Sequence, residues 1–171
     1  DTVLLEEPGY YGAGSAFLSA GADLAPLHVS DHGWDLVPLP VPPRLIFVTP
    51  SCHQPLGVTM PMEQRLNLIH MAERWNSWII EDDYDSEYRF QGQPIPALHG
   101  ISASNRVVYV GTFAKILFPA MRLGFLVVPE AFREGLISAL SVTGQFPPLL
   151  TQAALADFIN EGHFARHLRR M

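Results

Sequence analysis

A single lysine, an acidic run and several aromatic and hydroxyl residues are the parts of this sequence that could perform chemistry. Lys115 is the only lysine among the 171 residues, and it lies in an apolar stretch just after a β-branched run. An amine buried in such a stretch loses its proton more readily than one in water, and the neutral amine attacks carbonyl groups. The alternative is a lysine whose ammonium group reaches solvent from the end of a strand. On its own, the position of Lys115 leaves both interpretations open.

The acidic run, Glu81-Asp82-Asp83-Tyr84-Asp85, directly follows the apolar residues 78–80. It could be a solvated turn, or its carboxylates Asp82, Asp83 and Asp85 could bind a metal ion, although the offsets exclude an EF-hand. A third interpretation is a strand-end carboxylate that pairs with a buried cationic ring nitrogen. Only this interpretation also needs an amine and a phenol nearby, which Lys115 and Tyr84 could supply.

The histidines do not indicate a metal site. Only His163 and His167 have ligand-like spacing, four residues apart on a predicted helix, and no third ligand accompanies them. We therefore interpret both as surface residues and expect no bound metal.

Strands alternate with helices along the chain, which predicts an α/β domain with a mostly parallel, mixed sheet and helices on both faces. Strands are predicted at 3–5, 24–29, 45–48, 78–80, 107–110 and 123–128, and helices at 11–20, 61–76, 130–141 and 148–161, with a further helix starting at 162–171. The proline-rich residues 31–43 predict a connector without a regular helix. The link before 123–128 is too short for a helical crossover, so this strand is predicted to be antiparallel.

The unusual residues follow the predicted strands, at 8–10, 51–57, 82–84 and 112–115. In a mostly parallel sheet these positions share one edge, where α/β proteins bind their ligands. The acidic run is expected to cap the strand that precedes it.

The composition indicates a domain whose surface is partly covered by another domain or subunit. Hydrophobic residues make up 48% of the chain and charged residues 16%, against about 25% charged residues in typical domains. We therefore expect apolar surface that meets another domain or subunit. The net charge of −6 argues against nucleic-acid contact by this segment.

The single cysteine and the two ends of the sequence indicate the cellular compartment and whether the sequence is part of a longer protein. No apolar run of transmembrane length and no signal peptide is evident, and Cys52 cannot form an internal disulfide, which fits a reducing, cytoplasmic setting. The first residue is not methionine, and a strand follows at once. We therefore expect an excised piece of a longer protein, formed by residues 1–171 as one truncated domain.

Five motifs, in this order and spacing, carry a family resemblance over essentially the whole chain. They are Glu7-Pro8-Gly9-Tyr10, the segment from Val48-Thr49-Pro50-Ser51 to Gly57-Val58-Thr59-Met60, the acidic segment 80–87, Gly111-Thr112-Phe113-Ala114-Lys115 with Pro119, and Arg122-Leu123-Gly124. With them the sequence resembles the aminotransferase-like, fold type I domain that binds pyridoxal 5′-phosphate. Within that class it is most similar to the MocR group of GntR-type transcriptional regulators.

The resemblance implies a role for eight residues. Lys115 would form a Schiff base with the cofactor aldehyde, Asp82 would keep the pyridine nitrogen protonated, and Tyr84 would donate to the ring oxygen. Tyr10 would stack on the ring, while Thr112 and Arg122 would bind the phosphate. Gln54 or His53 would face the ring oxygen. Taken singly, Tyr10 could instead be a core aromatic residue, Thr112 a turn residue and Arg122 an ion-pair partner.

The sequence also departs from the family pattern. Ala114 stands where serine is common, and the prolines of 37–43 replace a short helix. The glycine- and serine-rich phosphate loop is expected before residue 1, and the C-terminal small domain after residue 171. We therefore do not expect turnover by this segment alone.

The implied function is an effector domain that senses pyridoxal phosphate or its adduct with an amino acid or amine. It would act as a homodimer and would reach DNA only through an N-terminal winged helix outside this chain. The alternatives are a catalytic aminotransferase and a non-catalytic remnant of a truncated gene.

Overall fold

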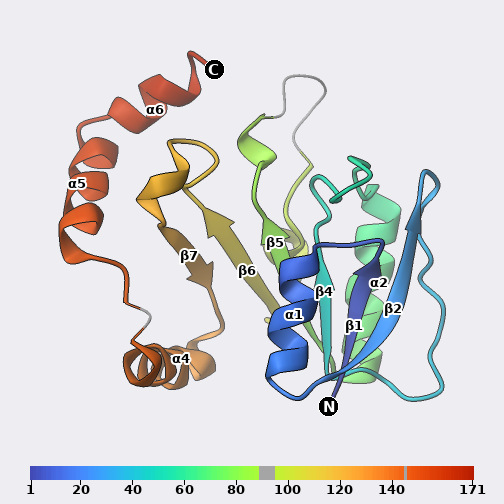
Figure 1. Cartoon of the computed structure of the whole chain (residues 1–171). Coiled ribbons are helices and arrows are strands. Elements are labelled where there is room, and N and C mark those ends of the chain that lie inside the picture. Colours follow the sequence, from blue (N-terminus) through green and yellow to red (C-terminus); the bar gives the residue numbers. More distant parts are fainter. Residues whose placement is uncertain (89–94, 145) are drawn as a thin grey trace.

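The strands of the chain form one mixed sheet in the order β3-β2-β1-β4-β5-β6-β7 (Figure 1). The computed structural model describes residues 1–88, 95–144 and 146–171. The strands are β1 (Thr2–Glu7), β2 (Asp23–Ser30), β3 (Gly33–Trp34), β4 (Leu45–Val48), β5 (Trp78–Asp83), β6 (Val107–Thr112) and β7 (Gly124–Val127). The helices are α1 (Tyr11–Ser19), α2 (Met62–Trp75), α3 (Leu98–Ile101), α4 (Glu130–Thr143), α5 (Leu149–Asn160) and α6 (His163–Leu168), with 3-10 turns at Ser86–Tyr88 and Pro119–Met121.

The pairing directions confirm the predicted α/β class. Strand β1 pairs in parallel with both β2 and β4, and β4, β5 and β6 continue the parallel set. Strand β7 is antiparallel to β6, as its short link predicted. The two-residue strand β3, antiparallel to β2, was not predicted. It is too short for a periodic signal, and the positive φ of Gly33 permits the turn that forms it.

Two right-handed crossovers place helices on opposite faces of the sheet. The unit β1-α1-β2 advances toward one edge, whereas β4-α2-β5 advances toward the other. Because parallel crossovers keep one handedness, this reversal sends α1 and α2 to different faces, as Figure 1 shows. The strand order reverses between β1 and β4, and ligands of open α/β sheets bind at such a point, beyond the carboxyl ends of the strands.

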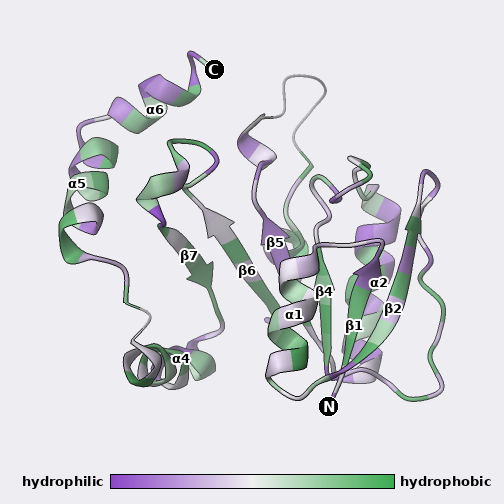
Figure 2. Ribbon diagram, viewed as in Figure 1, coloured by the Kyte–Doolittle hydropathy of each residue, from purple (hydrophilic) through white to green (hydrophobic). Residues whose placement is uncertain are grey.

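The hydrophobic core lies between α2 and the sheet. Leu68, Ile69, Met71 and Ala72 of α2 pack against the buried strand residues, which include Leu4, Ile46, Val48, Ile79 and Val107. The helix predicted at 61–76 is confirmed, and Leu66 within it is 41% exposed and lies outside this core. Figure 2 shows the strands as hydrophobic over most of their length, with hydrophilic residues where β1 and β5 end.

Arg65 of α2 carries a charge, yet it is fully buried. Its Nε donates to the carbonyl of Met60 at 3.0 Å, Nη2 to Pro50 at 2.8 Å and Nη1 to Pro96 at 3.1 Å. Nη1 also lies 3.8 Å from Oε1 of Glu81. A buried guanidinium is stable only with such partners, so Arg65 holds the loops after β4 and before α3 against the sheet.

The surface near the C-terminal half is apolar, as the composition predicted. No residue of α4 is buried, and Val142 and Leu149 are 87% and 82% exposed. Every residue of β7 is exposed as well. In the described part of the chain, no helix is long and apolar enough to cross a membrane.

Candidate functional site

The residues singled out in the sequence gather at one edge of the sheet. Tyr10 follows β1, His53 and Gln54 lie in the loop after β4, and Tyr84 follows β5. Thr112 ends β6, and Lys115 and Arg122 lie in the connection to β7. Because β7 is antiparallel, its first residues lie at the same edge as the carboxyl ends of the parallel strands.

Lys115 lies in a tight turn directly after β6. The N–H of Leu117 donates to the carbonyl of Phe113 at 3.0 Å and closes this turn. The side chain of Lys115 is exposed, so the interpretation that it is buried in an apolar stretch is wrong for this chain. Its Nζ lies 5.2 Å from the centre of the Tyr84 ring, which places the amine beside the phenol as the resemblance implies.

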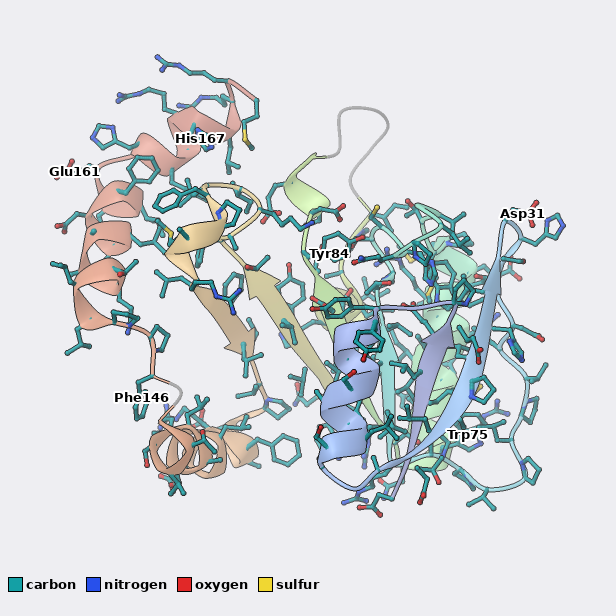
Figure 3. The ribbon with its side chains drawn as sticks, in the orientation of Figure 1. Asp31, Trp75, Tyr84, Phe146, Glu161 and His167 are labelled. Carbon is teal, nitrogen blue, oxygen red and sulfur yellow. The ribbon has the colours of Figure 1, made fainter. Side chains whose placement is uncertain are left out.

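Tyr84 joins two of the loops at the edge. Its hydroxyl donates to the carbonyl of Cys52 at 2.8 Å, and Figure 3 shows the residue near the end of β5. Burial raises the pKa of the Tyr84 phenol well above its ordinary value, and the Cys52 side chain and nearby acidic groups act in the same direction. The phenol is therefore a neutral hydrogen-bond donor at physiological pH. Cys52 was not predicted as part of the site, because a backbone carbonyl leaves no signal in the residue types.

The acidic run is not a solvated turn. Strand β5 continues through Asp83, so these residues extend the strand instead of capping it. Alternate side chains of a strand point to opposite faces, and Glu81 and Asp83 are buried on the same face. Glu81 lies beside Arg65 and accepts the N–H groups of Leu98 and His99, while Asp83 accepts the Tyr109 hydroxyl at 2.8 Å.

Asp82 points to the opposite face of β5 and is half-buried. Burial raises its pKa to about 6, and the negative charges of Asp83 and Asp85 add to that rise. A cation beside Asp82 would offset both effects, so this carboxylate fits a protonated ring nitrogen. Among the described residues, no group of three or more His, Cys, Asp or Glu side chains is arranged to hold a metal ion.

Thr112 contacts the backbone of Leu123, the residue after Arg122, so Thr112 and Arg122 are close to each other. The Thr112 hydroxyl accepts the N–H of Ala114 at 3.1 Å and donates to the carbonyl of Leu123 at 3.4 Å. In this structure the hydroxyl therefore serves the turn, which was the alternative interpretation of Thr112. Arg122 is exposed and has a left-handed backbone, with φ of 51°. Its guanidinium is accessible to an anion.

Tyr10 and Gln54 are both on the surface of the edge. The Tyr10 ring is 44% exposed, so it is not the core aromatic residue that the alternative interpretation described. Gln54 is also exposed, in the loop after β4. Both side chains are accessible to a ligand at this edge.

His53 belongs to the core and does not face the ligand edge. It is buried, its Nδ1 accepts the N–H of Leu56 at 3.4 Å, and its Nε2 lies 3.7 Å from Oε2 of Glu6. Its ring packs edge-on against Trp34. Burial lowers the pKa of the imidazole. The expectation that His53 faces a ring oxygen is therefore wrong, and Gln54 remains the candidate.

Glu6 is an ionisable residue that the sequence did not single out. Its carboxylate accepts the indole N–H of Trp34 at 2.6 Å, and the N–H and hydroxyl of Thr49 at 2.9 and 2.6 Å. These bonds tie β1 to β3 and to the end of β4, beneath the loops that carry Tyr10 and Gln54. Burial raises the pKa of Glu6 to about 7, although the hydrogen bonds act against this rise.

His167 was expected on the surface, and this expectation is wrong. Its side chain is half-buried, and Nε2 lies 2.8 Å from the carbonyl oxygen of Ile116, the residue after Lys115. Figure 3 labels His167 on α6. His163, by contrast, is near Glu161 at the surface, with 42% of its side chain exposed. The partners in the first contact are 51 residues apart, so only the folded chain reveals it.

The comparisons with known proteins identify the family. The model of the aminotransferase class I and II family matches residues 1–171, and the chain belongs to this family. It is similar over 99% of its length to the solved structure of LysN, an α-aminoadipate aminotransferase from Thermus thermophilus, with a TM-score of 0.92 and 29% identity. It covers 46% of that structure, which holds N-(5′-phosphopyridoxyl)-L-leucine. A kynurenine aminotransferase from Pyrococcus horikoshii gives a TM-score of 0.88 at 25% identity, with 99% of this chain and 45% of that chain covered.

Several similar curated proteins are transcriptional regulators. The chain is 59% identical, over its whole length, to the probable rhizopine catabolism regulatory protein MocR of Rhizobium meliloti. It is 38% identical over its whole length to the regulator TauR of Rhodobacter capsulatus. It is also 32% identical, over 98% of its length, to the pyridoxine biosynthesis regulator PdxR of Corynebacterium glutamicum. The chain spans 35% of MocR and TauR and 37% of PdxR. The family and these structural neighbours imply pyridoxal phosphate as the cofactor.

Proposed function

We propose that this chain is the pyridoxal-phosphate-binding, aminotransferase-like effector domain of a transcriptional regulator. It senses the cofactor, or the adduct of the cofactor with an amino acid or amine. The position of Lys115 carries the proposal, because the only side-chain amine of the chain lies 5.2 Å from the Tyr84 ring, at the ligand edge. The 59% identity to MocR supports a regulator in preference to an enzyme.

Each candidate residue has a distinct task toward the cofactor. When bound, pyridoxal phosphate supplies an aldehyde and an electron-withdrawing ring. Lys115 Nζ is the amine that holds the cofactor covalently. The Asp82 carboxylate accepts a hydrogen bond from the N–H of a cationic ring nitrogen, and the negative charges of Asp83 and Asp85 nearby favour a cation at this position. Tyr84, a neutral phenol, donates a hydrogen bond to a ring oxygen once it leaves the Cys52 carbonyl.

The remaining candidates bind the periphery of the cofactor. The exposed guanidinium of Arg122 offers paired donors to the phosphate. Thr112 lies beside it through the Leu123 carbonyl, and its hydroxyl would turn from that carbonyl to the phosphate. Tyr10 lies against a face of the ring, and Gln54 donates to the ring oxygen.

The proposed partners follow from the relatives and from the surface. DNA is bound by a winged helix N-terminal to this segment, in keeping with the net charge of −6 here. The exposed apolar residues of β7, α4 and α5 fit a homodimer, in which a second subunit and the flanking domains cover them. A cytoplasmic location follows from the role in transcription.

Reductive trapping tests the cofactor site. Pyridoxal phosphate is added to the purified chain and to the whole protein, borohydride reduces the adduct, and mass spectrometry locates the label. The sequence of this chain offers one lysine, so within it a label on any residue other than Lys115 can only be at the N-terminal amine. Lys115→Arg keeps the positive charge beside Tyr84 but cannot be trapped. The proposal fails if the whole protein carries no label at Lys115.

Measurements on the whole protein separate the regulator from the enzyme. We expect DNA affinity to change when the cofactor and an amine bind, with slow transfer of the amino group to a keto acid. Rapid transfer without any change in DNA affinity would identify an aminotransferase. Absence of any cofactor binding would identify a non-catalytic remnant.

A further inference from the structure

Helix α6 contacts the turn that carries Lys115 at two points. His167 Nε2 lies 2.8 Å from the carbonyl oxygen of Ile116, the residue after Lys115. Phe164 packs edge-on against Phe113, two residues before Lys115, with ring centres 5.9 Å apart. Phe164 and His167 are three positions apart and so share one face of the helix. The two contacts bracket Lys115 from both sides along the chain.

The turn is anchored at its ends but carries Lys115 outward. The Leu117 N–H closes it onto the Phe113 carbonyl at 3.0 Å, and the Phe113 N–H donates to the Leu123 carbonyl at 3.0 Å. Ile116 is buried, at 3% exposure, whereas Lys115 is exposed. The side chain of Ile116 therefore points into the protein, and that of the preceding Lys115 points out. The orientation of the backbone at Ile116 sets the direction of the Lys115 side chain.

Helix α5, which precedes α6, packs less closely than α6 against the connection between β6 and β7. A cavity of about 240 Å³ lies between α5 and the β6–β7 connection, and its walls include Phe113, Leu123 and Leu155. Leu155 is the buried residue of α5. Phe113 is the only residue of the turn that lines this cavity, so α5 makes few contacts with the turn, and α6 makes the direct hydrogen bond to it.

We propose that His167 is a positioning residue for Lys115. Its Nε2–H donates to the Ile116 carbonyl and, with Phe164, holds the turn so that the Lys115 amine points to the ligand edge. This proposal rests on the proposed function, because it concerns the bond between Lys115 and pyridoxal phosphate. That bond forms when the amine and the aldehyde condense to C=N with release of one water and no change in oxidation state.

Two ligands separate positioning from a general structural role. Pyridoxal phosphate can bond to Lys115, whereas pyridoxine 5′-phosphate carries an alcohol in place of the aldehyde and can only bind noncovalently. In the whole protein, His167→Leu removes the donor and His167→Gln retains an N–H donor. The control is His163→Leu, the same change on the same helix at a residue that contacts Glu161 instead.

We expect His167→Leu to bind pyridoxal phosphate about fivefold more weakly, the effect of losing one neutral hydrogen bond, with unchanged affinity for pyridoxine phosphate. His167→Gln and His163→Leu should bind both ligands like the wild type. Equal weakening for both ligands, or weakening for neither, would overturn the proposal. If His167→Leu does not fold, Phe164→Leu replaces it, with the same selective loss expected.

The trapping experiment keeps this result separate from the proposed function. A wild-type protein without a label at Lys115 refutes both proposals. A labelled wild type with no selective loss in the variants refutes only the role of His167.

Discussion

The buried carboxylate of Glu6 should make the protein less stable as the pH rises through neutrality. Substitution Glu6→Gln removes the ionisation and keeps the shape of the side chain. The amide oxygen can still accept the N–H groups of Trp34 and Thr49, and the amide nitrogen can donate to the Thr49 hydroxyl, which now acts as the acceptor. The perturbation therefore tests the charge of Glu6 more than its hydrogen bonds.

The magnitude follows from the pKa of Glu6, which burial raises from 4.5 to about 7. A raised carboxyl pKa favours the protonated form in the folded state, so its stabilising contribution is complete below pH 4.5. This contribution is lost as the pH rises to about 7 and does not change further above that. Between pH 5 and pH 8 the loss amounts to about 2–3 kcal/mol, at about 1.4 kcal/mol per unit of pKa.

Urea denaturation at pH 5 and pH 8 measures the effect. Asp82, whose pKa is raised to about 6, also contributes to the wild-type pH dependence. Only the difference between wild type and Glu6→Gln is therefore assigned to Glu6. Glu7→Gln is the matched control, since it removes the same charge from the adjacent, exposed residue. The reasoning is refuted if wild type and Glu6→Gln lose the same free energy of unfolding between the two pH values.

Two further substitutions test the packing around the site by urea denaturation. Arg65→Met should lower the free energy of unfolding by about 3–5 kcal/mol, because it leaves the buried carboxylate of Glu81 without its cation. Arg74→Met, at an exposed position of the same helix, should change it by less than about 0.5 kcal/mol. Gly9→Ala should cost about 1–3 kcal/mol, because its Cβ would overlap the backbone oxygen of Glu6. Gly100→Ala, where nothing surrounds the added methyl group, should be neutral or slightly stabilising, and equal effects at the two glycines would contradict this explanation.

The regular elements of the fold could be predicted from sequence because local patterns specify them. The strands other than the two-residue β3 appear as short apolar runs bounded by turn residues, and α2 shows a helical period. Sequence patterns did not predict burial where tertiary contacts stabilise a charged residue in the interior. Arg65 is buried because three backbone carbonyls and one carboxylate surround it. Of these partners, only the Met60 carbonyl is close in the sequence, whereas Pro50, Glu81 and Pro96 come from other segments.

The candidate site was predictable in its location but not in its details. Loops at the carboxyl ends of parallel strands must share an edge, so Lys115, Asp82 and Tyr84 could be placed together from their positions after predicted strands. Which way each side chain points depends on the loop conformation. His53 and Gln54 are adjacent, yet the first is buried beside Glu6 and the second is exposed.

The exposure of Lys115 changes the physical account of the site. Because Lys115 is exposed, the covalent bond proposed for it cannot depend on burial of the amine. The two faces of β5 differ in the partners of their carboxylates. Glu81 and Asp83 lie on one face, beside Arg65 and Tyr109, whereas Asp82 lies on the other face. Asp82 is left half-buried among like charges. A ligand with a cationic ring nitrogen relieves that repulsion, so Asp82 favours the same ligand that we propose Lys115 binds.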